Sequence, residues 1–116
     1  KDIRMTVHET LQRLESKVER VAGSLDEEGK RELTGLLDDL RSEVQSLAET
    51  HEEDAESIAG YTQTSLHEAG REHRNPKLLQ HSIDGLSSSV EVFERSHARL
   101  VQTVNSLCTM LSNIGI

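Results

Sequence analysis

The chain has 116 residues, the length of one domain, with a net charge of −8, 29% charged residues and 2% aromatic residues. This charge disfavours nucleic acid and anionic membrane surfaces as partners, because both attract clustered lysine and arginine. The single cysteine excludes an intrachain disulfide framework, and no apolar run is long enough for a transmembrane helix or a signal-peptide core. We therefore expect a cytoplasmic protein.

The first predicted helix covers residues 3–22. Its apolar residues step by four, three, four and three positions, which is the heptad spacing of a helix with one apolar stripe. Gly23 provides a C-terminal stop. The stripe consists of Val7, Leu11, Leu14, Val18 and Val21.

A second helix is predicted over residues 25–49. Ser24 and Glu27 have the spacing of a capping box and mark its start. Because the connection around Gly23 is short, we expect the first two helices to form an antiparallel hairpin. The heptad spacing repeats at Leu33, Leu37, Leu40, Val44 and Leu47.

Residues 50–74 give a weaker helical signal. Their apolar positions are mostly small, and Gly60 and Gly70 each lower helix propensity by ~1 kcal/mol. The segment is predicted to be a thinly packed helix. It either extends the second helix or starts anew at Thr50, which has capping-box spacing to Glu53.

Asn75 and Pro76 mark the start of the last helical region, predicted over residues 76–113, since Asn caps well and Pro is favoured at the first helical position. The apolar residues beyond keep one heptad register. This register allows a single long helix or two helices that meet near Ser96. The stripe comprises Leu79, Ile83, Leu86, Val90, Phe93, Leu100, Val104, Leu107 and Leu111.

The fold class predicted from these patterns is all-α, with residues 1–116 as a single helical domain. An antiparallel helical hairpin and a long C-terminal helix would form a coiled-coil-like helical bundle. No strand is predicted, because the alternation of apolar and polar residues that strands require is absent.

The end of the chain resembles a known family. Residues 93–97 read Phe-Glu-Arg-Ser-His and residues 111–116 read Leu-Ser-Asn-Ile-Gly-Ile. They are similar to the Phe-Glu-x-Ser-His-Pro element and the Leu-Ser-x-(Ile/Met/Leu)-Gly-Ile ending of the bacterial family called domain of unknown function 4404. Residues 8–11 and 25–28 also resemble its first hairpin. The family has no established activity, so the resemblance implies only a small soluble bacterial protein. Ala98 stands where the family usually has Pro, which favours a continuous helix.

The sequence offers little for catalysis or metal binding. Glu94 and His97 have the Glu-x-x-His spacing of di-iron bundles, but such sites need two copies of the motif and two further Glu residues. Cys108 lies late in its helix, away from the cations that activate a thiol, and is expected to be buried and inert. Ser87–Ser89 lacks the Gly-x-Ser-x-Gly elbow of a nucleophile. We expect no catalytic residue, no metal and no cofactor.

The length of the C-terminal stripe favours self-association. A helix of about 37 residues would span roughly 55 Å, and the first helix would cover only ~30 Å of it. We therefore expect a homodimer, with the residues of the C-terminal stripe as the contact surface. The predicted role is a non-enzymatic self-association or protein-interaction module, which could also bind an unknown protein. The alternatives are a metal-binding bundle using Glu94 and His97, or a ligand site assembled across a dimer interface.

Overall fold

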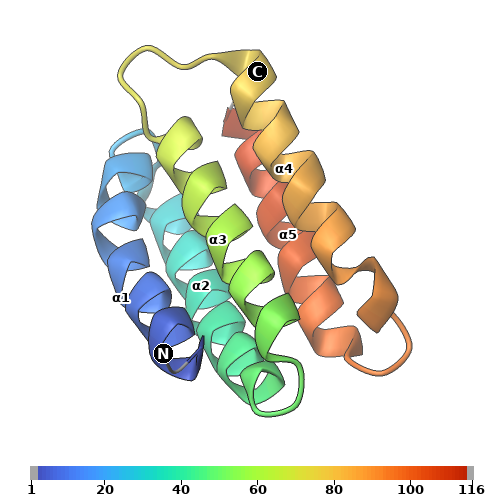
Figure 1. The fold of residues 1–116 in the computed structure, drawn as a ribbon. Coiled ribbons are helices and arrows are strands. Elements are labelled where there is room, and N and C mark those ends of the chain that lie inside the picture. Colours follow the sequence, from blue (N-terminus) through green and yellow to red (C-terminus); the bar gives the residue numbers. More distant parts are fainter. Residues whose placement is uncertain (1–2, 115–116) are drawn as a thin grey trace.

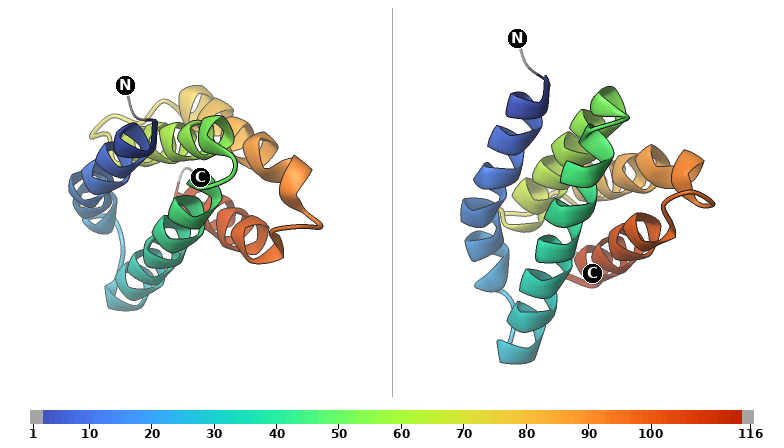
Figure 2. Two further views of the ribbon diagram at one scale, coloured as in Figure 1. Left: turned by 60° about the horizontal axis from the view of Figure 1, so that its bottom comes forward. Right: turned by 90° about the horizontal axis from the view of Figure 1, so that it is seen from below.

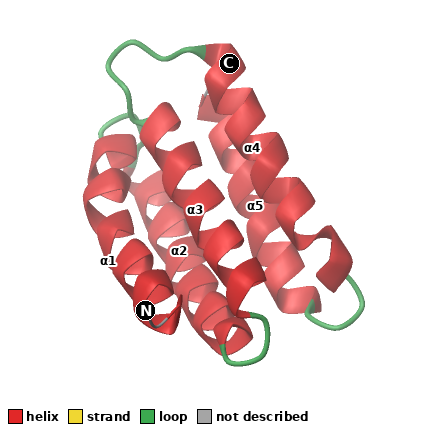
Figure 3. Cartoon of the chain, in the orientation of Figure 1, coloured by secondary structure: helices red, strands yellow, loops and turns green. Residues whose placement is uncertain are grey.

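The computed structural model describes residues 3–114 and the side chains of residues 7–114 (Figure 1). The fold is all-α, as predicted, and residues 3–114 contain no strand (Figure 3). Within this range, no helix is both long and apolar enough to cross a membrane. The helices in chain order are α1 (Ile3–Ala22), α2 (Glu27–Ala48), α3 (Glu52–Ala69), α4 (Pro76–Val90), the short 3₁₀ helix η1 (Glu91–Phe93) and α5 (Ala98–Ile114).

The helices form two layers. α1, α3 and α4 lie side by side in one layer, and α2 and α5 form the second layer behind it (Figures 1 and 2). α1 and α2 contact each other as the predicted antiparallel hairpin. The main contacts of α1 are nevertheless with α3, which lies between α1 and α4.

The segment predicted to be thinly packed is the central helix of the first layer. α3 is separate from α2, and it ends at Ala69, before the predicted limit of residue 74. Small buried side chains let neighbouring helices approach closely, because the distance between helix axes depends on the side chains at the contact. The buried side chains of α3 are Ala55, Ile58, Ala59, Thr62, Ser65, Leu66 and Ala69.

Two of the three predicted N-caps, Ser24, Thr50 and Asn75, are corrected. The N-cap of α2 is Asp26, whose Oδ1 accepts a hydrogen bond from the Gly29 amide at 2.7 Å, so Ser24 is not the cap. A carboxylate also interacts favourably with the positive end of the helix dipole. α3 follows His51, and no side chain caps it, so the predicted cap at Thr50 is wrong.

The predicted start of α4 is confirmed. The Asn75 Oδ1 accepts hydrogen bonds from the amides of Lys77 and Leu78 at 3.1 and 3.3 Å, and Pro76 occupies the first turn. This satisfies two of the amides that a helix leaves without an internal partner at its start.

The long C-terminal helix is two helices. α4 stops at Val90, and α5 starts at Ala98 and runs back beside α4, so the continuous helix favoured by Ala98 is wrong (Figure 1). The break lies over residues 91–97, mostly before the predicted position near Ser96. Folding back brings the two halves of the stripe together, which buries apolar surface that a straight helix would leave exposed.

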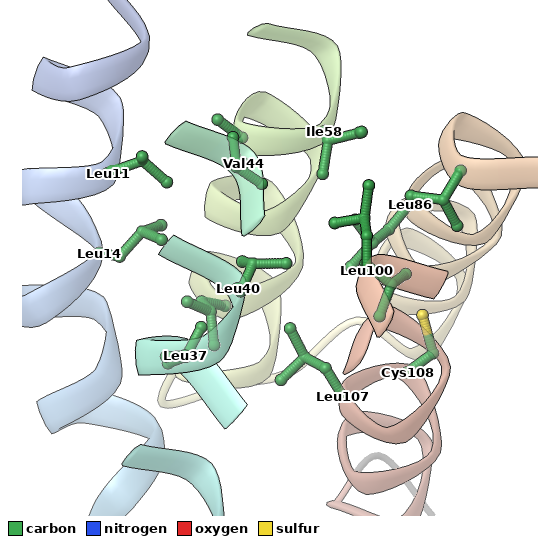
Figure 4. Packing of buried hydrophobic residues seen from close by; sticks show 14 of the residues in the cluster. Leu11, Leu14, Leu37, Leu40, Val44, Ile58, Leu86, Leu100, Leu107 and Cys108 are labelled. Carbon is green, nitrogen blue, oxygen red and sulfur yellow. The ribbon is translucent and has the colours of Figure 1, made fainter. Parts of the chain in front are cut away.

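One chain covers the whole C-terminal stripe. All nine predicted stripe residues are buried, with no more than 4% of any of them exposed. Figure 4 shows Leu86, Leu100 and Leu107 facing residues of α2 and α3 in a shared core. The principal extents are 36 × 29 × 26 Å, so a single C-terminal helix of roughly 55 Å is wrong.

Arg74 joins three segments at the end of the bundle where the chain passes from α3 to α4. Its Nε donates to the Ala69 carbonyl, its Nη1 to the Ile114 carbonyl and its Nη2 to the Ser24 hydroxyl, each at 2.9 Å. Two of these acceptors lie at the C-terminal ends of α3 and α5, where a positive charge is favourable to the helix dipole.

Candidate functional site

The stripe predicted as the contact surface for a second chain forms the core of this one. Its nine residues are held by contacts of α4 and α5 with each other and with α2 and α3. The argument for a dimer that rested on an uncovered stripe therefore no longer applies. Any contact surface has to be sought among exposed side chains.

Glu94 and His97 lie in the turn that separates α4 from α5. Glu94 is exposed, and the His97 Nδ1 is 2.9 Å from the hydroxyl of Ser96. Among the described residues, no group of three or more His, Cys, Asp or Glu side chains is placed to hold a metal ion. The arrangement therefore gives no support to the metal-binding alternative.

The turn contains a ring cluster that the sequence did not reveal. Phe93 makes edge contacts with His51 and His97, with ring centroids 5.3 Å apart in each pair, and the two His rings are 6.0 Å apart. His51 precedes α3 and His97 precedes α5, so the cluster ties the α2–α3 connection to the α4–α5 connection. Its signal in the sequence is weak, because 42 residues separate Phe93 from His51.

Cys108 is a buried free thiol, as predicted. Its Sγ lies 3.8 Å from the Ile83 carbonyl of α4. Burial, with a smaller contribution from the negative charge of Asp84, raises the pKa of Cys108 to about 11. Because the thiolate is the nucleophile, this thiol is poorly suited to redox or nucleophilic chemistry at neutral pH.

The serine run in α4 is part of the helix surface. The Ser89 hydroxyl donates to the Leu86 carbonyl at 2.6 Å, and Ser88 is exposed. Hydroxyl groups bonded back to the preceding turn are common in helices and need no base beside them. Nothing in this arrangement activates a serine as a nucleophile.

A hollow of about 720 Å³ lies beside Arg74, where Leu25, Met110 and Ile114 form its apolar part. The only cationic side chain in its lining is Arg74, and all three nitrogens of this guanidinium donate to protein oxygens. The positive charge of Arg74 therefore interacts with groups of the chain itself, two of them at helix ends, and is not directed at a ligand.

The outer side of α3 and α4 carries the exposed large apolar side chains of the described chain. Tyr61 is 44% exposed, Leu78 43% and Val92 78%. Leu78 and Gly85 are seven residues apart, so they lie along one side of α4, and Val92 of η1 lines the same hollow as Tyr61 and Gly85. Gly85 contacts the ring of Tyr61. We call the set of Tyr61, Leu78, Gly85 and Val92 the α3–α4 seam.

Gly85 sets the approach of the two helices in the α3–α4 seam. A Cβ atom at Gly85 would come within 2.7 Å of Tyr61 Cδ1 and 3.1 Å of Tyr61 Cζ. Glycine therefore lets the ring approach α4 closely. Sequence reasoning missed this seam, although the seven-residue spacing of Leu78, Gly85 and Val92 was visible.

A second hollow, of about 550 Å³, lies on the α3–α4 seam between Tyr61 and Val92. Asp54 and Asp84 contribute its charges, and no Lys, Arg or His lines it. The exposed Lys77 lies further along α4, toward its start. The seam is thus acidic near Val92 and carries a positive charge near Leu78.

Comparison with known proteins gives one match. Residues 33–116 match the family described as a domain of unknown function (DUF4404). No curated protein and no solved structure matches the chain. The matched residues begin inside α2, so they omit α1 and residues 25–28. The resemblance predicted for the first hairpin therefore lies outside the match. In the structure, α1 nevertheless covers one side of α3, which belongs to the matched region.

Proposed function

The chain belongs to the DUF4404 family, and we propose that it is a non-enzymatic helical module for protein–protein interaction that self-associates as a homodimer. The observation that carries this proposal is the α3–α4 seam. Three large apolar side chains are exposed along one seam of a strongly acidic chain, whereas the residues of its C-terminal stripe are buried. Exposed apolar groups gathered on one side of a small domain favour an interaction surface there.

The proposal keeps the role predicted from the sequence, which is self-association, but assigns it to a different surface. The residues of the C-terminal stripe are already buried in one chain, so a second chain has to contact other residues. A ligand site completed by a second chain remains a prediction, and the hollow between Tyr61 and Val92 is where we would look for it.

The mass of the untagged protein in solution tests the proposal. Light scattering over a series of micromolar concentrations is expected to show a rise from 13.0 kDa toward twice that mass. A mass of 13.0 kDa at every concentration would contradict self-association. The matched variant Val92→Ser changes only an exposed side chain and is expected to shift the mass toward the monomer.

We also propose a bacterial cytoplasmic setting. It rests on the resemblance of the terminal motif and on the single cysteine being a free, buried thiol. Reducing compartments keep such thiols unpaired. Fractionation of native cells, with the protein detected by antibody, would place it directly.

A further inference from the structure

The apolar residues of the α3–α4 seam are arranged symmetrically about Gly85. Leu78 lies seven residues before Gly85 and Val92 seven residues after it. At 1.5 Å per residue, Leu78 is roughly 10 Å from Gly85 along α4, and Val92 lies in η1, two residues beyond the other end of α4. A two-fold axis passing close to Gly85 would therefore bring Leu78 onto Val92 of the partner subunit, and the same contact would occur twice.

The position of Tyr61 fits the same axis. Its ring covers Gly85, so it occupies the centre of the α3–α4 seam. With 44% of its surface exposed, it presents a flat apolar group at the point where two copies related by this axis would meet. Contacts of a residue with its own copy at the axis are a property of two-fold interfaces. Paired aromatic rings add to the gain from burial.

The charges along α4 are also complementary under this operation. Lys77 lies near the start of the helix, and Glu91 lies just beyond its end. Both are exposed. In an antiparallel pair of α4 helices, Lys77 comes near Glu91 of the partner subunit. Opposite charges at the rim fix register and orientation more than they add affinity.

One group opposes the association. Asp84 is exposed next to Gly85, so it comes near its own copy at the axis. Its side chain accepts a hydrogen bond from Gln80 at 2.8 Å but has no cationic partner among the ion pairs of the described side chains. Like charges close together are unfavourable, which predicts that a neutral residue here strengthens the pairing.

We propose that two copies of this chain associate antiparallel through the α3–α4 seam, about a two-fold axis near Gly85. This inference rests on the proposed self-association and specifies its surface. The occupant is a second copy because reversal about Gly85 exchanges Leu78 with Val92, and reversal about the adjacent Asp84 exchanges Lys77 with Glu91.

Cross-linking tests the predicted register. In a Cys108→Ala background, Leu78→Cys and Val92→Cys are made as single variants, and the two proteins are mixed under oxidising conditions or with a short bismaleimide. We expect covalent dimers in the mixture and few in either single variant, because identical positions lie roughly 20 Å apart across the axis. Gln102→Cys, exposed on α5, controls for random collision.

The outcomes separate the interface from the proposed function. A dimeric mass with no cross-link between positions 78 and 92 above the Gln102→Cys control would overturn the seam while keeping self-association. Efficient cross-linking of Leu78→Cys to itself would indicate a parallel register and also overturn it. A monomeric mass at every concentration would overturn both proposals.

Charge reversal gives an independent test of orientation. Lys77→Glu and Glu91→Lys are each expected to raise the dimer dissociation constant severalfold, and the double variant is expected to restore it. Asp84→Asn is expected to lower the constant. If the double variant is no better than the two single variants, the antiparallel orientation is wrong. Circular dichroism confirms that each variant keeps its helix content.

Discussion

The two sides of α4 differ in what they contact, although the same heptad spacing runs along both. On the inner side, Leu79, Ile83 and Leu86 are buried against neighbouring helices of the same chain. On the outer side, Leu78 and, just beyond the end of α4, Val92 remain exposed, with Gly85 midway between them in the sequence. The comparison teaches that a long apolar stripe need not be a contact surface for a second chain, because a chain that folds back can bury its longest stripe in its own core.

The largest expected effect is on the free energy of unfolding, when the same substitution of Leu by Ala is made on the inner and on the outer side of α4. Leu86→Ala removes a fully buried side chain and is expected to lower the free energy of unfolding by about 2–5 kcal/mol. Leu78→Ala, on the same helix, is expected to change it by less than about 1 kcal/mol, because the side chain is 43% exposed.

Urea denaturation followed by circular dichroism, at a concentration where the protein is monomeric, measures both values. Equal losses for the two variants would mean that the inner and outer sides of α4 are not distinct. The dissociation constant should respond in the opposite way, with Leu78→Ala weakening the dimer.

A smaller effect is expected at the centre of the α3–α4 seam. Gly85→Ala places a methyl group against the Tyr61 ring and is expected to cost about 1–3 kcal/mol of stability, since forced overpacking has this magnitude. The double variant Gly85→Ala with Tyr61→Ala should recover most of the loss.

Gly60→Ala in α3 is the matched control, because a Cβ there meets nothing within 4 Å. It is expected to stabilise the protein by about 0.5–1 kcal/mol through helix propensity. Thermal unfolding ranks the variants. A Gly85→Ala protein as stable as Gly60→Ala would show that the ring contact sets no limit on the helix approach.

The smallest expected effect concerns Cys108 of α5, which packs against the inner side of α4, at high pH. The folded pKa of Cys108, about 11, lies above the ordinary value of 9.0, so the unfolded chain loses its thiol proton first as the pH rises. Stability from this group is therefore full below pH 9.0 and decreases as the pH rises from there toward about 11.

Denaturation of the protein and of Cys108→Ala over this pH range, with their difference taken, isolates the effect. Alkylation by iodoacetamide should likewise be slow at pH 8 in the folded protein and fast in urea. Rapid alkylation of the folded protein at pH 8 would contradict the buried, protonated thiol.

The sequence was sufficient to predict the individual helices of this fold but not how those helices pack against one another. The heptad steps located α1 within its observed bounds and α2 within two residues at its start, and Asn75 with Pro76 located the start of α4. The turn after Val90 was ambiguous because Val90, Phe93, His97 and Leu100 keep the steps of an unbroken helix. Because the heptad spacing continues unchanged across the turn, the spacing does not reveal where the turn lies.

The candidate site was not predictable for a different physical reason. Tyr61 and Gly85 lie 24 residues apart, and their contact depends on α3 lying beside α4. Leu78 and Val92 lie off the main stripe, and single exposed apolar residues are normal on any protein. These residues form a candidate contact surface only because the fold places all of them along one seam.

The central place of α3 has a consequence for how the protein folds. α1 and α4 both lie against this helix, and its own side chains there are mostly small. Neither the N-terminal hairpin nor the α4–α5 pair can complete its core while α3 is unfolded. We expect one cooperative unfolding transition, with coincident loss of helix content and of core packing, and no stable fragment on either side of α3.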